Sequence, residues 1–402
     1  MRSAKFAVIS GIRPLRRSHD EDLTLRVFSI ATISLALVAT TLSACSTTDF
    51  RQRAIDEQID PAEPGGGLRL TFFGTSSFLI DDGTTQLLID GFVTREKHRY
   101  FRRFGPSEQQ IRTVIAEHRI CRAPGAPRKA EDPASCRNVA RRGLELVIPT
   151  HGHYDHALDA PYFAAWSGAT LVADPSILSV VKASQAYPGF SLPQRDWLSV
   201  KTIPPFADGA QTAHLAAGAF SVTLIKTPHG KNPTTPLLSG TTSAALKFPS
   251  SLWALKEGTA FSVFVAHRGR TMLFVPSAGD IGDIFRQAGT KADIIFLGIA
   301  GLGFKPPRAR SRYWNDVVRT VGAKRVIPIH WDDDQVPLNV ADGDTFKPAS
   351  PRRFDATLRI FDELARECGL EIAFPPPARA FDPFKDLETR LITETKFQPR
   401  CE

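Results

Sequence analysis

Apolar and polar positions alternate along the chain in a way that predicts short strands and helices from Leu68 onward. Two β-rich runs come first, LRLTFFGTSSFLI at 68–80 and TQLLID at 85–90, and the Asp-Asp-Gly turn between them predicts a hairpin. Farther on, short apolar runs such as LELVIPT at 144–150 alternate with segments of helical periodicity. This mixture of hairpins and strand–helix units predicts an α/β sandwich with two central sheets.

The last predicted helix is the clearest one. Ser350 stands where a helix cap is needed, Pro351 suits the first helical position, and Gly369 suits the end. Helical spacing predicts that one face of this helix is buried, and the face consists of Phe354, Leu358, Phe361 and Ala365.

The N-terminal residues follow a different pattern. Basic residues precede a charge-free apolar stretch at 27–44, which predicts a secretory signal over 1–45. Leu42 to Cys45 resemble the lipobox of bacterial lipoproteins. This likeness implies cleavage before Cys45, a lipid on its thiol, and a protein exported to the cell envelope and anchored on a membrane facing the periplasm. The alternative is a transmembrane anchor, because the stretch borders on the length that spans a bilayer. Residues 46–67, ending in PAEPGGG, are expected to form a flexible linker.

Four cysteines remain after Cys45, and an exported protein meets an oxidising compartment that favours disulfides. Four cysteines allow three connectivities. We favour Cys121 with Cys136 and Cys368 with Cys401, because each pair closes a loop within one region. Four unpaired buried thiols are the alternative.

The formal net charge of +8 is too small to indicate nucleic-acid binding, and no nucleic-acid-binding motif is present, so no such partner is expected. Positive charge is nevertheless concentrated in an insertion at 92–143, which holds thirteen Lys and Arg against five Asp and Glu. Such a face would attract an anionic substrate or phosphate headgroups. A solvated face without a partner is the alternative. The sequence does not predict an oligomeric state.

Candidate chemistry is concentrated directly after the apolar run 144–150. His151, His153, Asp155 and His156 lie within six positions. Neutral imidazole and carboxylate are preferred ligands of zinc and related metals, and packing several together without a metal is costly. Three further ligand-type residues each follow an apolar strand: His229, Asp280 and His330. Because open α/β sheets place ligands at strand ends, these seven residues are predicted to meet.

In order and spacing, the seven residues resemble the metallo-β-lactamase-fold hydrolase superfamily, whose hallmark is HxHxDH followed by distant His, Asp and His. The resemblance covers about 68–375, with a tail at 376–402, and implies a four-layer αβ/βα sandwich. It implies two divalent metal ions, zinc above Mn or Fe. One ion would be held by His151, His153 and His229. The other would be held by Asp155, His156 and His330, with Asp280 bridging the two. Asp90 would support the ligand loop through hydrogen bonds.

The resemblance implies hydrolysis by a metal-bridged hydroxide, with Asp155 and Asp280 as catalytic residues. Asp280 points away from true β-lactamases. The segments LTFFGTSSFLI, HGHYDHALD and FLGIAGLGF resemble the branch containing N-acylphosphatidylethanolamine phospholipase D and ascorbate-6-phosphate lactonase. A phosphodiester or phospholipid-like small molecule or lipid is therefore the expected substrate, with a lactone, amide or thioester as the alternative. A metal-binding lipoprotein without turnover is a third possibility, distinguished by whether its ligand set is closed.

Overall fold

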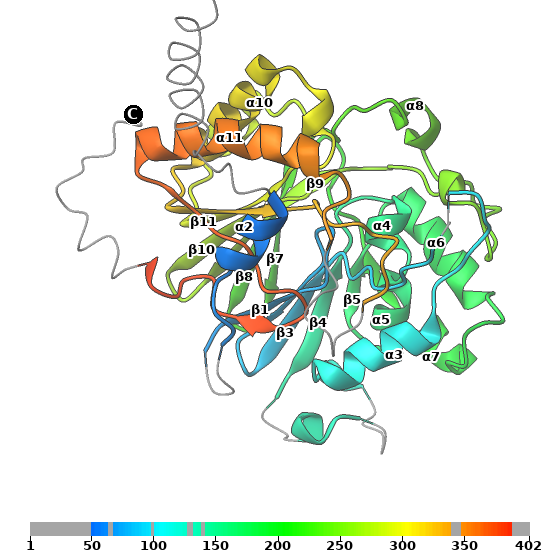
Figure 1. Cartoon of the computed structure of the whole chain (residues 1–402). Helices are drawn as coiled ribbons and strands as arrows, with labels where there is room; N and C mark the ends of the chain where they lie inside the picture. Colours follow the sequence, from blue (N-terminus) through cyan, green and yellow to red (C-terminus); the bar gives the residue numbers. More distant parts are fainter. Residues whose placement is uncertain are drawn as a thin grey trace, which may run out of the picture. The chain divides into compact units, whose positions relative to one another are not determined.

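A computed structural model describes residues 50–62, 67–97, 100–126, 132–137, 141–338 and 347–387 (Figure 1). The predicted signal at 1–45, Cys45 and Cys401 lie outside these residues. Two seven-stranded sheets form the centre of the described part of the chain. None of the helices in the described ranges is both long and apolar enough to cross a bilayer.

The first sheet carries the residues that precede and follow the histidine cluster. Its strands β14, β1, β2 and β3 are antiparallel neighbours, and β3, β4, β5 and β6 are parallel. In sheet order, the strands are β14 (Ala380–Phe381), β1 (Arg69–Phe72), β2 (Phe78–Asp81), β3 (Thr85–Ile89), β4 (Gly143–Ile148), β5 (Thr170–Val172) and β6 (Lys201–Ile203).

The second sheet is assembled in a similar way from the rest of the chain. Strands β13, β12, β11 and β10 are parallel, and β10, β9, β8 and β7 are antiparallel. In sheet order, the strands are β13 (Glu371–Ile372), β12 (Arg325–Ile329), β11 (Ile294–Gly298), β10 (Arg270–Val275), β9 (Phe261–His267), β8 (Phe220–Lys226) and β7 (Thr212–Ala217).

Helices cover the outer sides of both sheets, with α10 and α11 on one side and α3, α5, α6 and α7 on the other (Figure 1). The helices are α2 (Phe50–Asp56), α3 (Glu108–Glu117), α4 (Tyr154–Ala157), α5 (Ala160–Ser167), α6 (Pro175–Gln185), α7 (Gln194–Leu198), α8 (Thr235–Leu238), α9 (Ile284–Gln287), α10 (Pro307–Trp314) and α11 (Pro351–Cys368). The 3₁₀ turns η1 (Ala134–Arg137), η2 (Leu252–Ala254) and η3 (Leu302–Phe304) and the π turn η4 (Asn315–Arg319) complete the set.

Alternation along the strands divides the apolar side chains between two cores. On β3, Leu87 and Ile89 belong to the core that includes the second sheet, whereas Leu88 belongs to the core beneath α3 and α5. The sheets meet at Phe78 of β2, whose ring centroid lies 5.3 Å from that of Phe274 and 4.8 Å from that of Phe296. The predicted four-layer αβ/βα sandwich is confirmed.

The last helix is found where its caps and periodicity predict it. Helix α11 runs from Pro351 to Cys368, and Gly369 ends it in a left-handed conformation with φ of 63°. Its predicted apolar face, Phe354, Leu358, Phe361 and Ala365, is buried. Ser350 occupies the cap position, but its side chain makes no capping hydrogen bond.

The folded region is longer at both ends than the predicted 68–375. Residues 50–62 do not behave as a linker: Phe50 of α2 is buried, with its ring 5.3 Å from Trp331 and 5.4 Å from Phe374. At the other end, β14 pairs with β1 and the side chains of Phe384 and Leu387 are buried, so 376–387 belong to the folded region. The Pro- and Gly-rich run at 61–67 suggested a linker. The apolar residues of α2 that precede this run pack into the hydrophobic core.

The structure contains the disulfide Cys121–Cys136. Cys368 is also disulfide-bonded. Its predicted partner, Cys401, lies outside the described residues, so the second predicted pair stays a prediction.

Candidate metal centre

Six of the seven predicted ligands meet at one end of the two sheets. Their ligand atoms form two groups of three, and within each group the atoms lie within 4.8 Å of one another. The loop after β4 and the first turn of α4 supply four of them, His151, His153, Asp155 and His156. His229 lies in the loop after β8, and His330 follows β12 directly. Loops at strand ends therefore deliver all six, as the sequence predicts.

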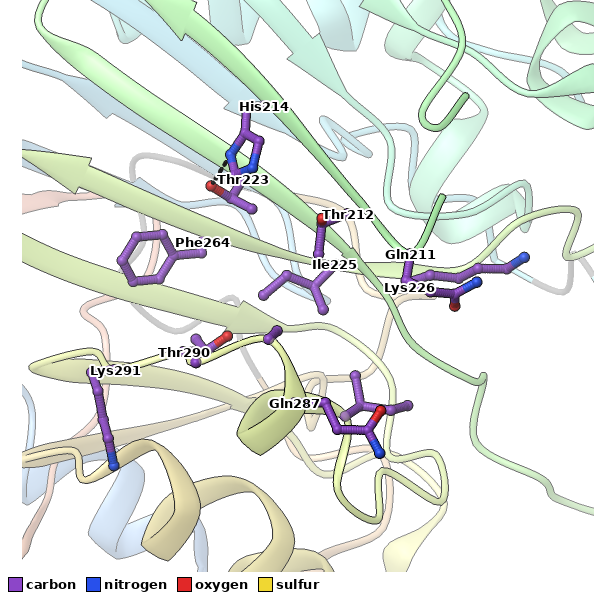
Figure 2. Close-up of a pocket in the computed structure, with 13 residues that line it drawn as sticks. Gln211, Thr212, His214, Thr223, Ile225, Lys226, Phe264, Gln287, Thr290 and Lys291 are labelled. Carbon is purple, nitrogen blue, oxygen red and sulfur yellow. Dashed lines mark hydrogen bonds between the residues drawn. The ribbon is translucent and has the colours of Figure 1, made fainter. Parts of the chain in front are cut away.

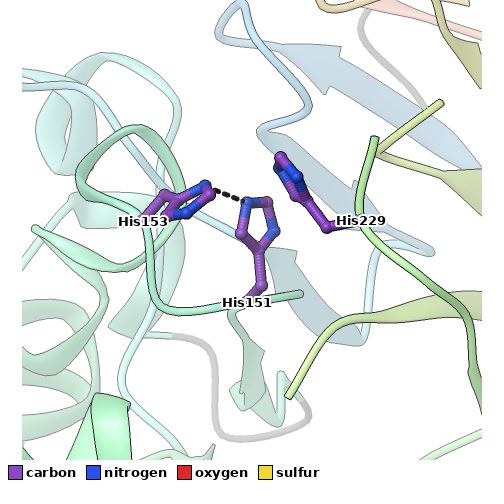
Figure 3. Close-up of side chains that lie close together, drawn as sticks. All are labelled: His151, His153 and His229. Atoms are coloured by element: carbon purple, nitrogen blue, oxygen red, sulfur yellow. Dashed lines mark hydrogen bonds between the residues drawn. The ribbon is translucent and has the colours of Figure 1, made fainter. Parts of the chain in front are cut away.

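The first group consists of His151, His153 and His229, whose rings converge (Figure 3). His151 Nε2 lies 2.9 Å from His153 Nδ1, and the His229 ring centroid lies 4.8 Å and 4.6 Å from theirs. Burial lowers the pKa of His151 well below its ordinary value, that of His153 to about 4, and that of His229 to about 3. The three imidazoles are therefore neutral near pH 7, which is the form that binds metal.

Close approach of the backbone makes this arrangement possible. A Cβ on Gly152, between the first two histidines, would lie 2.3 Å from the carbonyl oxygen of Lys256. Only glycine fits there, and its N–H donates to the carbonyl of Glu257 at 2.7 Å. The ligand loop is thus held against the segment that precedes β9.

The second group consists of Asp155, His156 and His330. Asp155 Oδ2 lies 3.6 Å from His156 Nε2 and 3.4 Å from His330 Nε2. Burial by itself would raise the pKa of Asp155, but interactions with the two histidines hold this pKa below its usual range, so the carboxylate is ionised. The His151 ring centroid lies only 3.8 Å from that of His156, which places the two groups side by side.

Asp90 takes the supporting position that the resemblance implies. Its side chain is buried, and Oδ2 lies 2.8 Å from His156 Nδ1 and accepts a hydrogen bond from Ser76 Oγ at 2.5 Å. Oδ1 accepts from the N–H and the hydroxyl of Thr150, at 2.7 and 2.8 Å. The contact with Nδ1 directs Nε2 of His156 toward the second group. Sequence reasoning missed Ser76 and Thr150; adjacency to His151 was the only available signal for Thr150.

A second support holds the backbone of His330, which has a left-handed φ of 61°. Its N–H donates to the carbonyl of Thr75 at 2.6 Å, and the N–H of Thr75 donates to Asp332 Oδ1 at 2.7 Å. Asp332 Oδ2 pairs with Arg95 at 2.7 Å, and both side chains are fully buried. Sequence reasoning placed Arg95 on a basic surface, because nothing local reveals a partner 237 positions away.

The structure does not bring Asp280 into either ligand group, so its predicted bridging role stays a prediction. Asp280 is exposed and lines an adjoining hollow of about 310 Å³, which includes Arg312 and shares the ligand His229 with the metal pocket. Strand β10 ends at Val275, and the four residues that follow carry the chain past the cluster, so that Ala278 lines the metal pocket instead. The structure therefore adds no support to the argument for a phosphodiester that rests on a bridging Asp280.

Because the Asp280 carboxylate lies outside both ligand groups, Asp280→Asn is expected to change kcat/KM less than about twofold. Steady-state hydrolysis with the metal-loaded protein measures this. A loss of kcat/KM above tenfold would instead support the predicted catalytic role of Asp280.

The two ligand groups open into one pocket of about 520 Å³. Its wall includes apolar and aromatic side chains from the loop after His229 and from neighbouring segments: Tyr100, Leu238, Leu252, Trp253 and Phe304. Three cations, Lys231, Lys305 and Arg353, also line it. The pocket therefore offers metal-binding side chains, apolar surface and positive charge to one bound molecule.

The positive charge of the basic insertion at 92–143 is less available to a partner than its composition suggests. Five of its arginines are in ion pairs: Arg95 with Asp332, Arg112 with Glu108, Arg122 with Asp132, Arg141 with Asp81, and Arg142 with Glu145. Much of this charge is therefore balanced within the fold.

A different cavity, of about 670 Å³, lies against β7, β8 and β9 (Figure 2). His214 is its one histidine, with Nδ1 3.0 Å from Thr223 Oγ1, and no carboxylate lines it among the described residues. It holds none of the six ligands and provides no metal site.

Comparisons with known proteins give a family match over part of the chain. Residues 70–242 match the family model described as metallo-beta-lactamase superfamily. Over 112 residues the chain is 29% identical to a protein of Heliobacterium modesticaldum described as a UPF0173 metal-dependent hydrolase. The match covers 28% of this chain and 32% of that relative, so the chain spans about a third of the relative's length.

Two solved structures that match this chain have low sequence identity to it. The metallo-beta-lactamase fold protein YhfI of Bacillus subtilis is 14% identical, with 80% of this chain and 99% of that chain covered and a TM-score of 0.39. Igni18, a metallo hydrolase of Ignicoccus hospitalis, is 15% identical, with 78% and 98% covered and a TM-score of 0.38. Similarity at this level indicates nothing about the substrate.

Proposed function

Because the chain carries a metallo-beta-lactamase superfamily domain, we propose that it is a metal-dependent hydrolase with a dinuclear centre. The observation that carries the proposal is the pair of three-residue ligand groups side by side in one pocket. A structural zinc site is usually closed by four protein ligands. Three ligands for each ion leave positions for water and substrate, which favours an enzyme over a metal-binding lipoprotein without turnover.

The residues present fit two divalent ions. Nδ1 of His229 is buried and has no hydrogen-bond partner among the described residues, and a bound metal ion would satisfy such a nitrogen. Five histidines and one carboxylate favour zinc over the harder ions, which prefer oxygen ligands. Two such ions activate water as a nucleophile near neutral pH and polarise the substrate oxygen. Within the chain, Asp155 is the ionised group that can accept a hydrogen bond from the attacking water.

A phosphodiester or phospholipid-like molecule is the substrate that we propose. The three cations of the pocket complement an anionic substrate, and the wall around Trp253 and Leu238 suits an aryl or acyl portion. A lactone, amide or thioester would use the same centre, but a substrate of that class without a negative charge gains less from the cations.

Metal analysis and a hydrolysis panel test both parts of the proposal. The purified domain is expected to bind about two equivalents of zinc, and a chelator is expected to abolish hydrolysis that added zinc restores. The panel is bis-p-nitrophenyl phosphate, N-acylphosphatidylethanolamine, homoserine lactones and a cephalosporin, with the phosphodiesters expected to react fastest. One tightly held equivalent would contradict the dinuclear centre. Turnover of lactones alone would replace the substrate class, and metal binding without any turnover would support the lipoprotein alternative.

A further inference from the structure

Three cations at the metal pocket have no acidic partner in the described part of the chain. Lys231 lies two residues after the ligand His229, Lys305 follows η3, and Arg353 is in the first turn of α11. The acidic groups that line the same pocket are engaged elsewhere. They are Asp155 in the second ligand group, Asp332 in its pair with Arg95, and Asp334, which accepts the Tyr154 hydroxyl at 2.6 Å. The charge of these cations is therefore available to a ligand.

Lys305 and Arg353 lie on two segments, η3 with the residue after it and the start of α11, that pack against each other. The Arg353 guanidinium lies 3.6 Å above the centroid of the Phe304 ring. A Cβ on Gly303 would lie 2.4 Å from the Cβ of Arg353, so this contact between η3 and α11 favours glycine. Gly303 belongs to the FLGIAGLGF run at 296–304. In the structure, this run brings Lys305 and the start of α11 to the pocket.

Buried Arg310 holds this contact in place. Its Nε donates to the carbonyl of Leu302 at 3.0 Å, Nη2 to that of Gly303 at 3.1 Å, and Nη1 to that of Ala356 at 3.0 Å. One guanidinium therefore links two carbonyls of η3 to α11. Fixed supports reduce the freedom that Lys305 and Arg353 would lose on binding an anion.

The start of α11 adds to the positive field. Ser350 and Arg353 line the pocket at the N-terminal end of an 18-residue helix, where the helix dipole favours negative charge. The Ser350 side chain makes no capping hydrogen bond, and its hydroxyl can donate to an anion in the pocket.

The total charge of the pocket exceeds what one phosphodiester balances. Only one of the six metal ligands is a carboxylate, so two divalent ions would already neutralise a reacting group with a single negative charge. We propose that Lys231, Lys305 and Arg353 bind a second anionic group of the substrate, a phosphate or a carboxylate, in addition to the group that is hydrolysed. The identity of the reacting group rests on the proposed function, but the anion site does not.

Binding of inorganic phosphate to the metal-free full chain tests the anion site by itself. Titration calorimetry at low salt is expected to detect binding that Arg353→Ala and Lys305→Ala each weaken about tenfold, the scale of losing a charge-assisted hydrogen bond. Arg352→Ala is the matched control, because Arg352 is the exposed neighbour of Arg353 and does not line the pocket. Equal phosphate binding by the three variants and the parent protein would overturn the proposal, as would no binding by the parent.

A pair of substrates links the anion site to turnover. The metal-loaded enzyme is compared on bis-p-nitrophenyl phosphate and on p-nitrophenyl phosphodiesters that carry an added phosphate or an added carboxylate. Arg353→Ala is expected to raise the KM of the esters with the added anion, relative to the KM of bis-p-nitrophenyl phosphate, by about fivefold, whereas Arg352→Ala leaves this ratio unchanged. The ester with the larger shift identifies the anion, and an unchanged ratio with both overturns the proposal. If no phosphodiester reacts but phosphate binding still depends on Arg353, the proposed function fails and the anion site stands.

Discussion

Asp155→Asn is expected to lower kcat/KM about a thousandfold and to reduce bound zinc from about two equivalents to about one. Asp155 is the only carboxylate among the six ligands, and its Oδ2 faces both His156 and His330. An amide at this position binds a divalent ion far more weakly and carries no charge to orient the attacking water. Metal analysis after dialysis and steady-state hydrolysis of bis-p-nitrophenyl phosphate measure the two effects.

Asp280→Asn is the matched control for this variant, since it makes the same change on an exposed carboxylate of a neighbouring hollow. Circular dichroism spectra that overlay would show that both variants are folded. The second ligand group would be refuted as a metal site if Asp155→Asn kept two equivalents of zinc and most of the activity.

Asp332→Ala is expected to lower the free energy of unfolding by about 3–5 kcal/mol. The change leaves Arg95 fully buried without its ionic partner and leaves the N–H of Thr75 without an acceptor. Because the carbonyl of Thr75 holds the N–H of His330, the same variant is expected to lose metal from the second ligand group. Urea unfolding of the metal-free protein measures the stability, and metal analysis measures the second effect.

An exposed ion pair provides the comparison. Arg286 and Asp283 pair at 2.5 Å with side chains 70% and 60% exposed, and Asp283→Ala is expected to cost about 1 kcal/mol or less. If Asp332→Ala does not fold, Asp332→Asn keeps an oxygen for Thr75 and is expected to fold with a smaller loss. Equal costs for the buried and the exposed pair would refute the role given to Asp332.

The local patterns of the sequence correctly predicted the architecture and most of the site. Alternating strands, the caps of α11 and the order of hairpins and strand–helix units predicted an α/β sandwich with two central sheets, because backbone geometry turns each pattern into one element. The family resemblance implied the four layers. The HxHxDH segment brings its four ligands together almost unaided, since they lie within one loop and one helical turn. His229 and His330 were predictable because each comes soon after a strand, and strand ends share one edge of the fold.

Features that depend on distant packing could not be read in the same way. Asp280 also follows a strand, but four residues separate it from the end of β10, and only the path of those residues decides that it turns away. The Arg95–Asp332 pair joins positions 237 residues apart, so composition placed Arg95 with the surface charges.

The sequence by itself determined the sandwich and the six convergent ligands, because short spacings and strand ends dictate them, and the family resemblance added the supporting Asp90. Tertiary structure alone decided that 50–62 and 376–387 belong to the fold, that Asp280 stands apart, and that Lys231, Lys305 and Arg353 share the pocket with the ligands. The physical reason is the range of the interactions. Hydrogen bonds within a turn act between near neighbours, whereas burial and ion pairing depend on which distant segments the packed sheets bring together.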